Sequence, residues 1–510
     1  MQGGAAVRRI ISLFLVLSLA LCLFGCGQNN VNRPIGGGLD SGQTTPTDPK
    51  EEEQAALTLV YDPADSMNPL LATGYTNRAI FGLIYQGLFT VDANYQVSPV
   101  LCRSYNVSAD RKTYTFYLCD AFFSDGTPIA ATDVVGSLTA AKSSAWYGGR
   151  FIHVTSISSY GDAVVIELDT AMENFPLLLD IPIVKATEVN AEQPLGTGPY
   201  RVAEDHLKRQ AAWWCSATLP VTADEIALLA YESAAQIRDA FEFESVSLIC
   251  SDPSSLDHVD FHSDYELWDC ENGLFLYLVC NENSPTLSKS PIRAALTHAI
   301  DRDKLVSTFY DGFAESASLP ASPSSPWYNQ ALANRYSYNQ EKFQAAVDEA
   351  NLGDTTIRFL VNTSDPTRAR IGNAIADMLR SYGLNIYIVT ATNDTFIKLL
   401  NKGEYDIYLA QTRLPKNMDL SAFFSTNGTL NYGGLADPSA YAISLEALSD
   451  KANFYTLHEL VMDDGLICPI LFQSYALYVQ RGDLSNFNPA RDAIFYYDLG
   501  RTMEDALSSN

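Results

Sequence analysis

Residues 356–410, TIRFLVNTSDPTRARIGNAIADMLRSYGLNIYIVTATNDTFIKLLNKGEYDIYLA, decide the fold class of this chain. Runs rich in β-branched and aromatic residues predict three strands, and apolar residues recurring every three to four positions predict a helix between successive strands. The first helix is expected to begin behind Asp365-Pro366 and to stop at Gly383. The expected strands cover 356–361, 384–390 and 405–410, and the second helix covers 394–401. This β-α-β-α-β order predicts an α/β fold with right-handed crossovers and helices on both faces of the sheet.

The segment that leaves the third strand is a candidate pocket. Ligands of such sheets bind outside the strand ends, where crevices open between the connections. Residues 413–424, RLPKNMDLSAFF, leave the third strand at such an end. We therefore expect ligand contacts in this segment.

An apolar run near the N-terminus predicts export. Arg8-Arg9 precedes the sixteen residues from Ile10 to Gly25, which are fewer than the ~20 that a membrane-crossing helix needs. Such a run is typical of a removable signal peptide, here residues 1–25. Because Leu23 to Cys26 form a bacterial lipoprotein cleavage box, we expect lipid chains on Cys26 that anchor the protein. The alternative is an ordinary signal peptide followed by an incidental cysteine.

Residues 26–56 differ in composition from everything that follows. They are rich in Gly, Asn, Ser, Thr, Pro and Asp, so they cannot bury enough apolar surface to offset the entropy of ordering. We expect a flexible tether. Since one hydrophobic core stops growing at roughly 250–300 residues, the remaining chain of about 455 residues implies at least two domains.

The charge balance argues against polyanionic partners. Acidic residues outnumber basic residues by 60 to 33, and the formal net charge is −27. Loss of residues 1–25, which contain two arginines and no acidic residue, would bring the charge to −29. Such a surface repels nucleic acid and anionic membranes. We expect a monomer without a nucleic-acid partner, held at the membrane only by its lipid.

The sequence contains no familiar catalytic motif. No H-E-x-x-H, G-x-S-x-G or G-x-x-x-x-G-K-[ST] pattern occurs, so a zinc protease, a serine hydrolase and a P-loop enzyme are not indicated. His258 and His262 are four residues apart, but in an expected loop. The seven cysteines after Cys26 include no C-x-x-C pair. Cys102 and Cys119 could pair across a hairpin, although buried free thiols are the simpler expectation. We expect no catalytic residue, no metal and no cofactor.

Several stretches, in order along the chain, together resemble the extracellular solute-binding proteins of family 5, the oligopeptide, dipeptide and nickel receptors of ABC importers. The order and spacing of these pieces carry the resemblance, since each piece alone would be weak. They are YQGLF at 85–89, SPVLCRSYNVSADRKTYTFYLCDAFFSDGTPIAATDVVGSL at 98–138, LGTGPYRV at 195–202, SPIRAALTHAIDRDKLV at 290–306, EYDIYLA at 404–410 and CPILFQSYALYV at 468–479.

The resemblance implies a periplasmic-binding-protein-like fold of type II, in which two hinged lobes close over a solute and an extra domain is added. The family carries out no chemistry on its solute. The implied first lobe comprises 57–90, 190–273 and 468–510, the extra domain 91–189, and the second lobe 274–467. The implied partners are a small solute, which we expect to be a peptide, and the permease subunits of an ABC importer. The implied location is the outer face of the bacterial cytoplasmic membrane.

The resemblance also implies where the solute binds. Peptide receptors of the family share a glycine-containing edge before the first helix, which matches Thr73-Gly74-Tyr75. They also share a tryptophan-to-aspartate segment whose carboxylate holds the peptide amino group, and this segment does not match. Residues 412–417 here are TRLPKN, and Asp419 is displaced along the chain.

The mismatch reverses the local charge. If Arg413 and Lys416 face the cleft, they would recognise a carboxylate or a phosphate. The alternative is that both are solvent-facing loop charges. Aromatic residues, Tyr75, Trp146, Tyr147, Phe423, Phe424, Tyr432 and Phe472, would form apolar walls or belong to the core. The candidate ligand contacts are Thr73, Gly74, Tyr75, Trp146, Arg413, Lys416, Asn417, Asp419 and Phe472.

The sequence favours a lipid-anchored receptor that delivers an oligopeptide, or another organic solute, to an ABC importer. A peptide sensor or a surface chaperone on the same scaffold is an alternative. A cell-surface hydrolase is a third possibility, but no residues support it.

Overall fold

The computed structural model describes residues 57–494, except 218–220, 222, 232, 256–257, 259–260, 433–434, 436, 485–486, 488 and 493. The expected signal peptide, the lipid site at Cys26 and the tether lie outside the described residues. None of the helices in the described part combines the length and the apolar character needed to cross a membrane.

The β-α-β-α-β unit expected from the sequence is confirmed. Its elements are β14 (Thr356–Asn362), α9 (Pro366–Ser381), β15 (Asn385–Ala391), α10 (Asn393–Lys402) and β16 (Ile407–Arg413). Strand β14 pairs in parallel with both β15 and β16. Asp365 accepts a hydrogen bond from the Arg368 amide at 2.9 Å and so caps α9. The two helices cover opposite faces, because α9 packs in one apolar cluster with Phe359 and α10 packs in another with Leu360.

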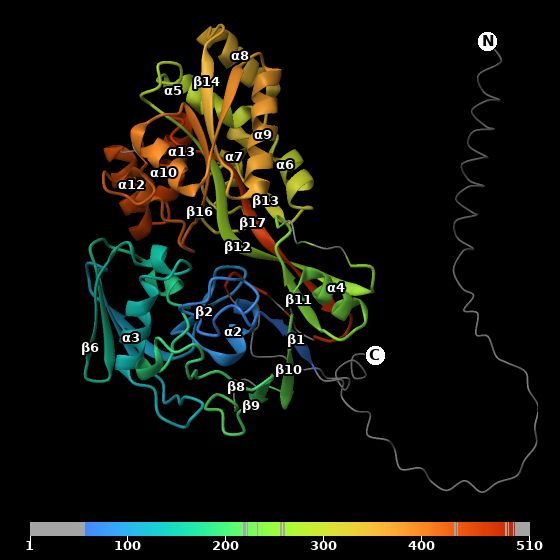
Figure 1. Ribbon diagram of the computed structural model, residues 1–510. Coiled ribbons are helices and arrows are strands. Elements are labelled where there is room, and N and C mark those ends of the chain that lie inside the picture. The colour runs from blue at the N-terminus through green and yellow to red at the C-terminus, as the bar shows by residue number, and fades with distance from the viewer. Residues whose placement is uncertain are drawn as a thin grey trace, which may run out of the picture. The chain divides into compact units, whose positions relative to one another are not determined.

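Two long antiparallel strands connect this unit to the rest of the protein. They are β12 (Tyr265–Cys280) and β17 (Cys468–Gln480), and both run from the upper to the lower group of elements in Figure 1. In the described residues the sheet order is β15-β14-β16-β12-β17-β11-β1-β10-β9-β8, with β13 paired to β17. The remaining strands are β1 (Thr58–Tyr61), β8 (Tyr200–Ala203), β9 (His206–Arg209), β10 (Glu225–Ala230), β11 (Leu248–Ser251) and β13 (Ala314–Ser316).

The ladder between β12 and β17 is irregular where the chain passes from one lobe to the other. Its register shifts between Glu271 and Phe275. Gly273 lies within this shift with φ of +75°, a conformation that favours glycine. The first residues of β17, up to Phe472, pair with the end of β12 and with β13, whereas Ser474 onward pairs with the start of β12 and with β11. The lobe ranges given above stay a prediction, and this pairing places the crossing inside β17.

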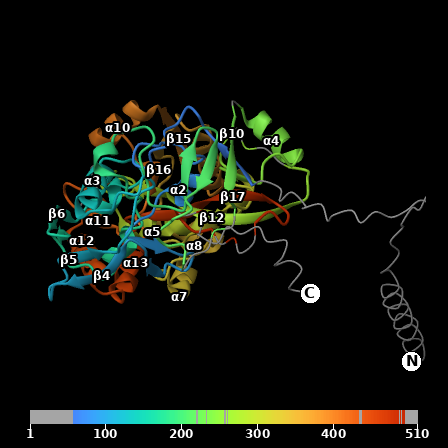
Figure 2. The same ribbon diagram turned by 90° about the horizontal axis from the view of Figure 1, so that it is seen from below.

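The segment 91–189 contains an antiparallel sheet of its own. Its order is β4-β5-β7-β6, and α3 packs against β6 and β7. This sheet and α3 lie at the opposite side of the fold from α4 and β10 in both ribbon views (Figures 1 and 2). The elements are β4 (Cys102–Val107), β5 (Thr113–Leu118), β6 (Val154–Tyr160), β7 (Ala163–Leu168), α3 (Ala131–Ala141) and the preceding hairpin β2 (Phe89–Val91) and β3 (Val97–Pro99).

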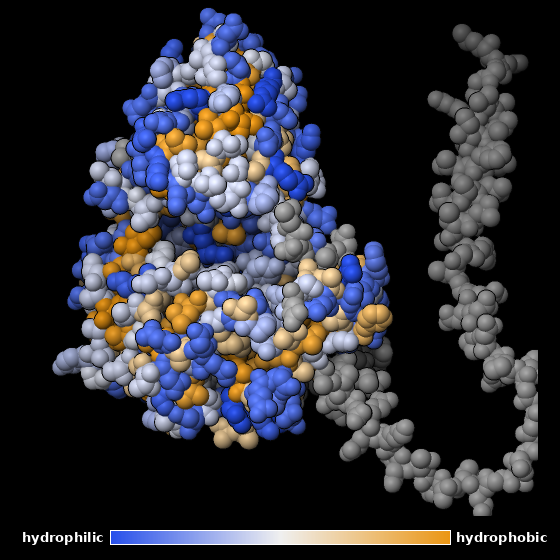
Figure 3. All heavy atoms as spheres, in the orientation of Figure 1, coloured by the Kyte–Doolittle hydropathy of each residue, from blue (hydrophilic) through white to orange (hydrophobic). Residues whose placement is uncertain are grey.

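Other helices cover the sheets. They are α2 (Arg78–Ile84), α4 (Ala234–Glu242), α5 (Ser290–Ala295), α6 (Arg302–Phe309), α7 (Gln330–Ala333), α8 (Gln340–Ala350), α11 (Ser421–Phe424), α12 (Pro438–Ser449) and α13 (Asn453–Asp463). The space-filling view shows a recess with hydrophilic side chains between the level of β16 above and that of α2 and β2 below (Figure 3).

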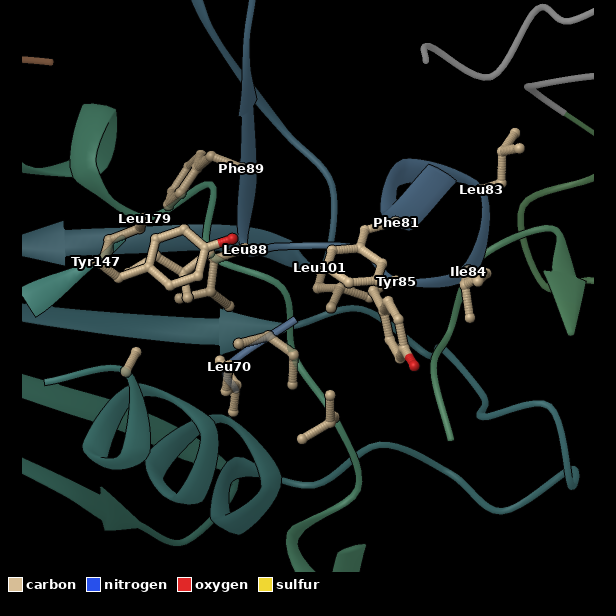
Figure 4. Close-up of a cluster of buried hydrophobic side chains, with 14 of the residues drawn as sticks. Leu70, Phe81, Leu83, Ile84, Tyr85, Leu88, Phe89, Leu101, Tyr147 and Leu179 are labelled. Carbon is tan, nitrogen blue, oxygen red and sulfur yellow. The ribbon is translucent and has the colours of Figure 1, made fainter. Parts of the chain in front are cut away.

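One apolar core joins the extra domain to the first lobe. Phe81 of the first lobe and Phe116 and Leu138 of the extra domain belong to the same buried cluster. Figure 4 shows part of it, with side chains from residues 70–101 together with Tyr147 and Leu179. Since burying one large apolar side chain contributes about 1.5–3 kcal/mol, this shared core fixes the position of the extra domain against α2.

Candidate solute-binding site

A cavity lies between the first lobe, the extra domain and the crossing strands, and its empty space, including the part open to solvent, is about 860 Å³. Small-molecule sites often form where domains meet. Its charged lining residues are Arg78, Asp180, Glu271 and Asp492. The aromatic lining residues are Tyr75, Phe81, Tyr85, Phe89, Trp146, Tyr147 and Tyr475.

Two guanidinium groups form cation–π contacts with the indole ring of Trp146. Arg78 of α2 lies 4.0 Å from the ring centroid, and Arg413 at the end of β16 lies 3.8 Å from it. Such cation–π contacts hold an arginine in place without neutralising its charge. Neither arginine has a carboxylate within 4 Å in the described part of the chain. This Arg78–Trp146–Arg413 stack therefore leaves two positive charges beside the cavity with no ion-pair partner there.

The predicted edge at residues 73–75 lies next to this stack. The Trp146 indole N–H donates to the Thr73 carbonyl at 3.3 Å. The amides of Thr73 and Gly74 donate to Asp65 at 3.0 and 2.9 Å. Burial raises the pKa of Asp65, but these hydrogen bonds outweigh it and lower the pKa overall. Asp65 thus holds residues 73–75 in place and already pairs the amides of Thr73 and Gly74. Of these three residues, Tyr75 lines the cavity.

Tyr75 and Tyr475 form an aromatic wall of the cavity. Their rings stack with centroids 5.0 Å apart and planes 29° apart. Arg413 bonds to the hydroxyl of Tyr475 and donates to the carbonyl of Asn272 on β12. Residues from the second lobe and from both crossing strands are thereby brought together at one place.

Lys416 belongs to a buried network of charges. It is 1% exposed, forms an ion pair with Asp180, and donates to the Arg491 carbonyl at 2.7 Å. Arg150 bonds to the same Asp180 at 2.5 Å and to Asp492 at 2.6 Å. Burial alone would raise the pKa of Asp492, but the neighbouring cations hold it well below its usual range. The alternative that Lys416 is a solvent-facing loop charge is wrong, because its ammonium is enclosed by these carboxylates.

Three further predicted residues do not line the cavity that contains Arg78 and Trp146. The Asn417 amide contacts the Met172 sulfur at 3.6 Å, and an Asp419 oxygen lies 3.1 Å from Nε2 of His153. Both contacts join the second lobe to the extra domain. Phe472 is 1% exposed and stacks on Phe275 at 4.8 Å within the core of the second lobe. Direct contact of these three residues with a solute stays a prediction.

His153 ties the extra domain to the start of α11. Its Nδ1 lies 2.8 Å from Asp169, and its Nε2 lies 3.0 Å from the Ser421 hydroxyl as well as close to Asp419. Burial lowers the pKa of His153, but its hydrogen bonds to the carboxylates of Asp419 and Asp169 raise the pKa above its ordinary value. Protonation therefore strengthens this contact between the lobes.

Sequence reasoning did not find Arg78, Tyr475, Glu271 or Asp492. Only Arg78 carried a usable signal, because it is the single charged residue of the helical run RAIFGLI. A lone cation in an otherwise apolar segment often serves a packed or functional contact. The other three are ordinary residues of strands or loops, and only the three-dimensional arrangement brings them to the cavity.

The described cysteines and histidines give no sign of a second kind of site. Cys102, Cys119 and the five other described cysteines are free thiols. In the described ranges no group of three or more His, Cys, Asp or Glu residues could hold a metal ion. His258 instead bonds through Nδ1 to the Ser251 hydroxyl at 2.8 Å.

Comparisons with known proteins agree with the resemblance seen in the sequence. The model of the bacterial extracellular solute-binding proteins, family 5 middle region, matches residues 96–433. A putative ABC transporter peptide-binding protein of Brucella ovis is 24% identical over 367 residues, which cover 66% of this chain and 68% of the relative. The family model covers 338 of the 510 residues, about two thirds of the chain.

Solved structures share the fold. The crystal structure of NikA from Brucella suis in complex with Fe(III)-EDTA superposes with a TM-score of 0.69 at 18% identity, and covers 87% of this chain and 99% of that one. The binding protein DppA from Helicobacter pylori in complex with the peptide STSA gives 0.61 at 18% identity, with 86% and 96% covered. The expected α/β fold of the type II periplasmic binding proteins, with two hinged lobes and an extra domain, is confirmed. The members of family 5 are substrate-binding proteins of ABC importers and are not enzymes. The chain belongs to this family, the bacterial extracellular solute-binding proteins of family 5.

Proposed function

We propose that this protein captures an oligopeptide, or a related organic solute, in the cavity lined by Arg78 and Trp146 and delivers it to the permease of an ABC importer. One observation carries the proposal: the cavity is walled by aromatic rings and has two arginines without a carboxylate partner in the described chain beside it. Aromatic walls with a few convergent polar groups are typical of sites for organic ligands. The Brucella ovis relative is named as a peptide-binding protein and the Helicobacter pylori neighbour is bound to a peptide, and both support a peptide as the solute.

The contacts across the cleft support a solute that is enclosed by closure. Arg413 and Lys416 of the second lobe reach Trp146 and Asp180 of the extra domain. The Glu173 amide also donates to the Leu448 carbonyl at 2.9 Å. A ligand that touches both sides stabilises the closed arrangement by its preference for that state. Closure would then present the loaded receptor to the permease.

The unpaired arginines favour a solute with an anionic group at this end. A guanidinium can bind a carboxylate through two parallel hydrogen bonds. Arg413 is already oriented by Trp146 and Tyr475, so less side-chain entropy is lost when the anion binds. A carboxylate is therefore the chemical group that we expect beside the Arg78–Trp146–Arg413 stack.

Replacing Arg413 with glutamine should weaken binding of the natural solute by at least ~1.5 kcal/mol, the magnitude for a hydrogen bond to a charged group. The solute would first be identified by mass spectrometry of material that co-purifies with the protein. Its affinity would then be measured by calorimetry, together with peptide, nickel-chelate and oligosaccharide panels. The matched control is Arg370→Gln, since Arg370 also lies over an aromatic ring, Phe309, at 5.2 Å, but is exposed on α9. Equal affinities of the wild type and the Arg413 variant would refute the role of this arginine, and binding of no compound at all would refute the receptor function.

We further propose that lipid chains on Cys26 hold the receptor at the outer face of the cytoplasmic membrane. The proposal rests on the cleavage box at residues 23–26 and on the Gly- and Ser-rich residues that follow. In cells fed labelled palmitate, the wild type should carry label and fractionate with membranes. A Cys26→Ala variant that retained the label would contradict the assignment.

A further inference from the structure

A second cavity adjoins the first at Glu271, and its empty space, including the part open to solvent, is about 670 Å³. Glu271 lines both cavities, so they meet at this residue. The walls of the second cavity come from the β2–β3 hairpin, from β12, β13 and β17, and from residues 489–491. It therefore lies at the point where the two long strands cross between the lobes.

Three carboxylates line one face of this cavity. Asp269 and Glu271 are two residues apart on β12, so their side chains share a face of the sheet. Glu315 of β13 pairs opposite Phe472 of β17, and Glu271 pairs opposite Ser474 two residues further along. Glu315 consequently lies on the same face as the other two. The three negative charges are thus gathered on neighbouring strands around one space.

Two of these carboxylates have no cation to balance them. No Lys, Arg or His nitrogen lies within 4 Å of Asp269 or Glu315 in the described part of the chain. Asp269 is exposed and Glu315 is half-buried, and burial together with the charges of Glu271 and Asp269 raises the pKa of Glu315. A positive charge placed between them would relieve this repulsion. Carboxylates with a perturbed pKa and no neighbouring cation are characteristic of binding sites as well as of active sites.

The cations that line the cavity lie closer to other groups than to Asp269 or Glu315, although the Arg491 Nε and Nη1 atoms stay beyond hydrogen-bond distance of their neighbouring carboxylates. The Lys416 ammonium is enclosed by Asp180 and the Arg491 carbonyl. Arg491 lies 3.8 Å from Asp492 and 3.6 Å from an oxygen of Glu271. Neither cation therefore neutralises Asp269 or Glu315.

Arg491 supplies a second and independent sign of a ligand. Its side chain is 6% exposed, and Nη2 donates to the Leu414 carbonyl. Its Nε and Nη1 have no hydrogen-bond acceptor, although both atoms are buried. Buried N–H groups in folded proteins are almost always paired. An acceptor oxygen from a molecule in this cavity would satisfy them.

We infer that the second cavity is the subsite for an organic ammonium group of the bound solute, held by Asp269, Glu271 and Glu315, with Arg491 donating hydrogen bonds to a neighbouring solute oxygen. The inference rests on the proposed function, because it assigns one end of the same solute. An ammonium next to a carbonyl oxygen is the arrangement at the first residue of a peptide. The solute then extends past Glu271, with its ammonium end at the three carboxylates and its anionic end at the Arg78–Trp146–Arg413 stack.

The test compares peptides that differ only in the ammonium group. Calorimetry would measure binding of tri-, tetra- and penta-alanine, each with a free and with an acetylated N-terminus. Acetylation removes the positive charge and should weaken binding at least tenfold, as expected for loss of a hydrogen-bonded charge pair. N-acetyl-alanyl-lysyl-alanine, the third arm, distinguishes the source of the amine. Restored affinity with this peptide would assign the subsite to a side-chain ammonium, and continued weakness would assign it to the N-terminus.

A double variant links the effect to these residues. In Asp269→Asn/Glu315→Gln the free and acetylated peptides should bind with equal affinity. The matched control is Glu266→Gln, because Glu266 lies on the same strand but on the opposite face. It should keep the full preference for the free N-terminus.

The outcomes separate this inference from the proposed function. If peptides bind but acetylation changes nothing in the wild type, or if the double variant keeps the preference, the ammonium subsite is refuted and the receptor function stands. If none of the peptides binds in either form, the proposed peptide receptor and the subsite both fall.

Discussion

Replacing Lys416 with methionine is expected to lower the free energy of unfolding by about 3–5 kcal/mol, the range measured when one partner of a buried ion pair is removed. Methionine keeps most of the side-chain volume but leaves Asp180 and Asp492 with one cation fewer. Both carboxylates are buried, with side chains 5% and 9% exposed. In the described chain Asp180 would keep Arg150 as its ion-pair partner, and Asp492 would keep Arg150 and, at 3.8 Å, Arg491.

Urea unfolding followed by circular dichroism would measure this loss. The matched control is Lys402→Met, since Lys402 is 66% exposed and its nearest carboxylate oxygen, on Glu404, is 3.8 Å away. Such surface pairs contribute little, so the control should change stability by less than about 0.5 kcal/mol. Similar losses in both variants would mean that the network around Lys416 does not stabilise the fold.

Gly273→Ala is expected to have the second largest effect, a loss of about 3 kcal/mol of stability. The backbone there has φ of +75°, and a non-glycine residue in a sparsely populated conformation costs of order 1–3 kcal/mol. The added methyl group would also overlap the guanidinium of Arg491. To make room, Arg491 would have to give up its hydrogen bond to the Leu414 carbonyl, which connects the crossing strands to residues 413–424.

The control for this substitution isolates the cost of the backbone. Gly126 has φ of +80°, and a methyl group there would meet no atom within 4 Å. Gly126→Ala should therefore cost only the local strain, about 1–2 kcal/mol. Thermal and urea unfolding of both variants would show the difference. An equal cost at the two positions would indicate that Arg491 moves aside freely and that its contact is not structurally important.

The second lobe could be predicted from the sequence because its signals are local. Asp365 with Pro366 marks the start of α9, and Gly383, with φ of +84°, follows its end. The apolar periods of 356–410 switch between two and 3.6 within one continuous stretch. Each of these signals depends on neighbours within a few residues, so no knowledge of distant contacts was needed.

The binding site was less accessible to sequence reasoning because its contacts are distant along the chain. Lys416 was expected at the solute, but its ion-pair partner Asp180 is 236 positions away, and nothing near either residue reveals the pairing. Arg413 was also predicted to contact the solute, and its guanidinium lies over the ring of Trp146 in the extra domain. A charged residue looks the same in sequence whether its partner is a solute or a buried carboxylate.

The irregular ladder at residues 271–275 has a mechanical consequence. On either side of it β12 and β17 remain paired, so each half of this ribbon resists bending while the short break between them does not. Opening and closing would then be concentrated in a few backbone torsions around Gly273, and each half would rotate as a stiff lever. Glu271 and Asn272 adjoin that pivot, where a small rotation displaces atoms least. The wall shared by the two cavities would therefore move little, and a solute would meet nearly the same wall in the open and the closed receptor.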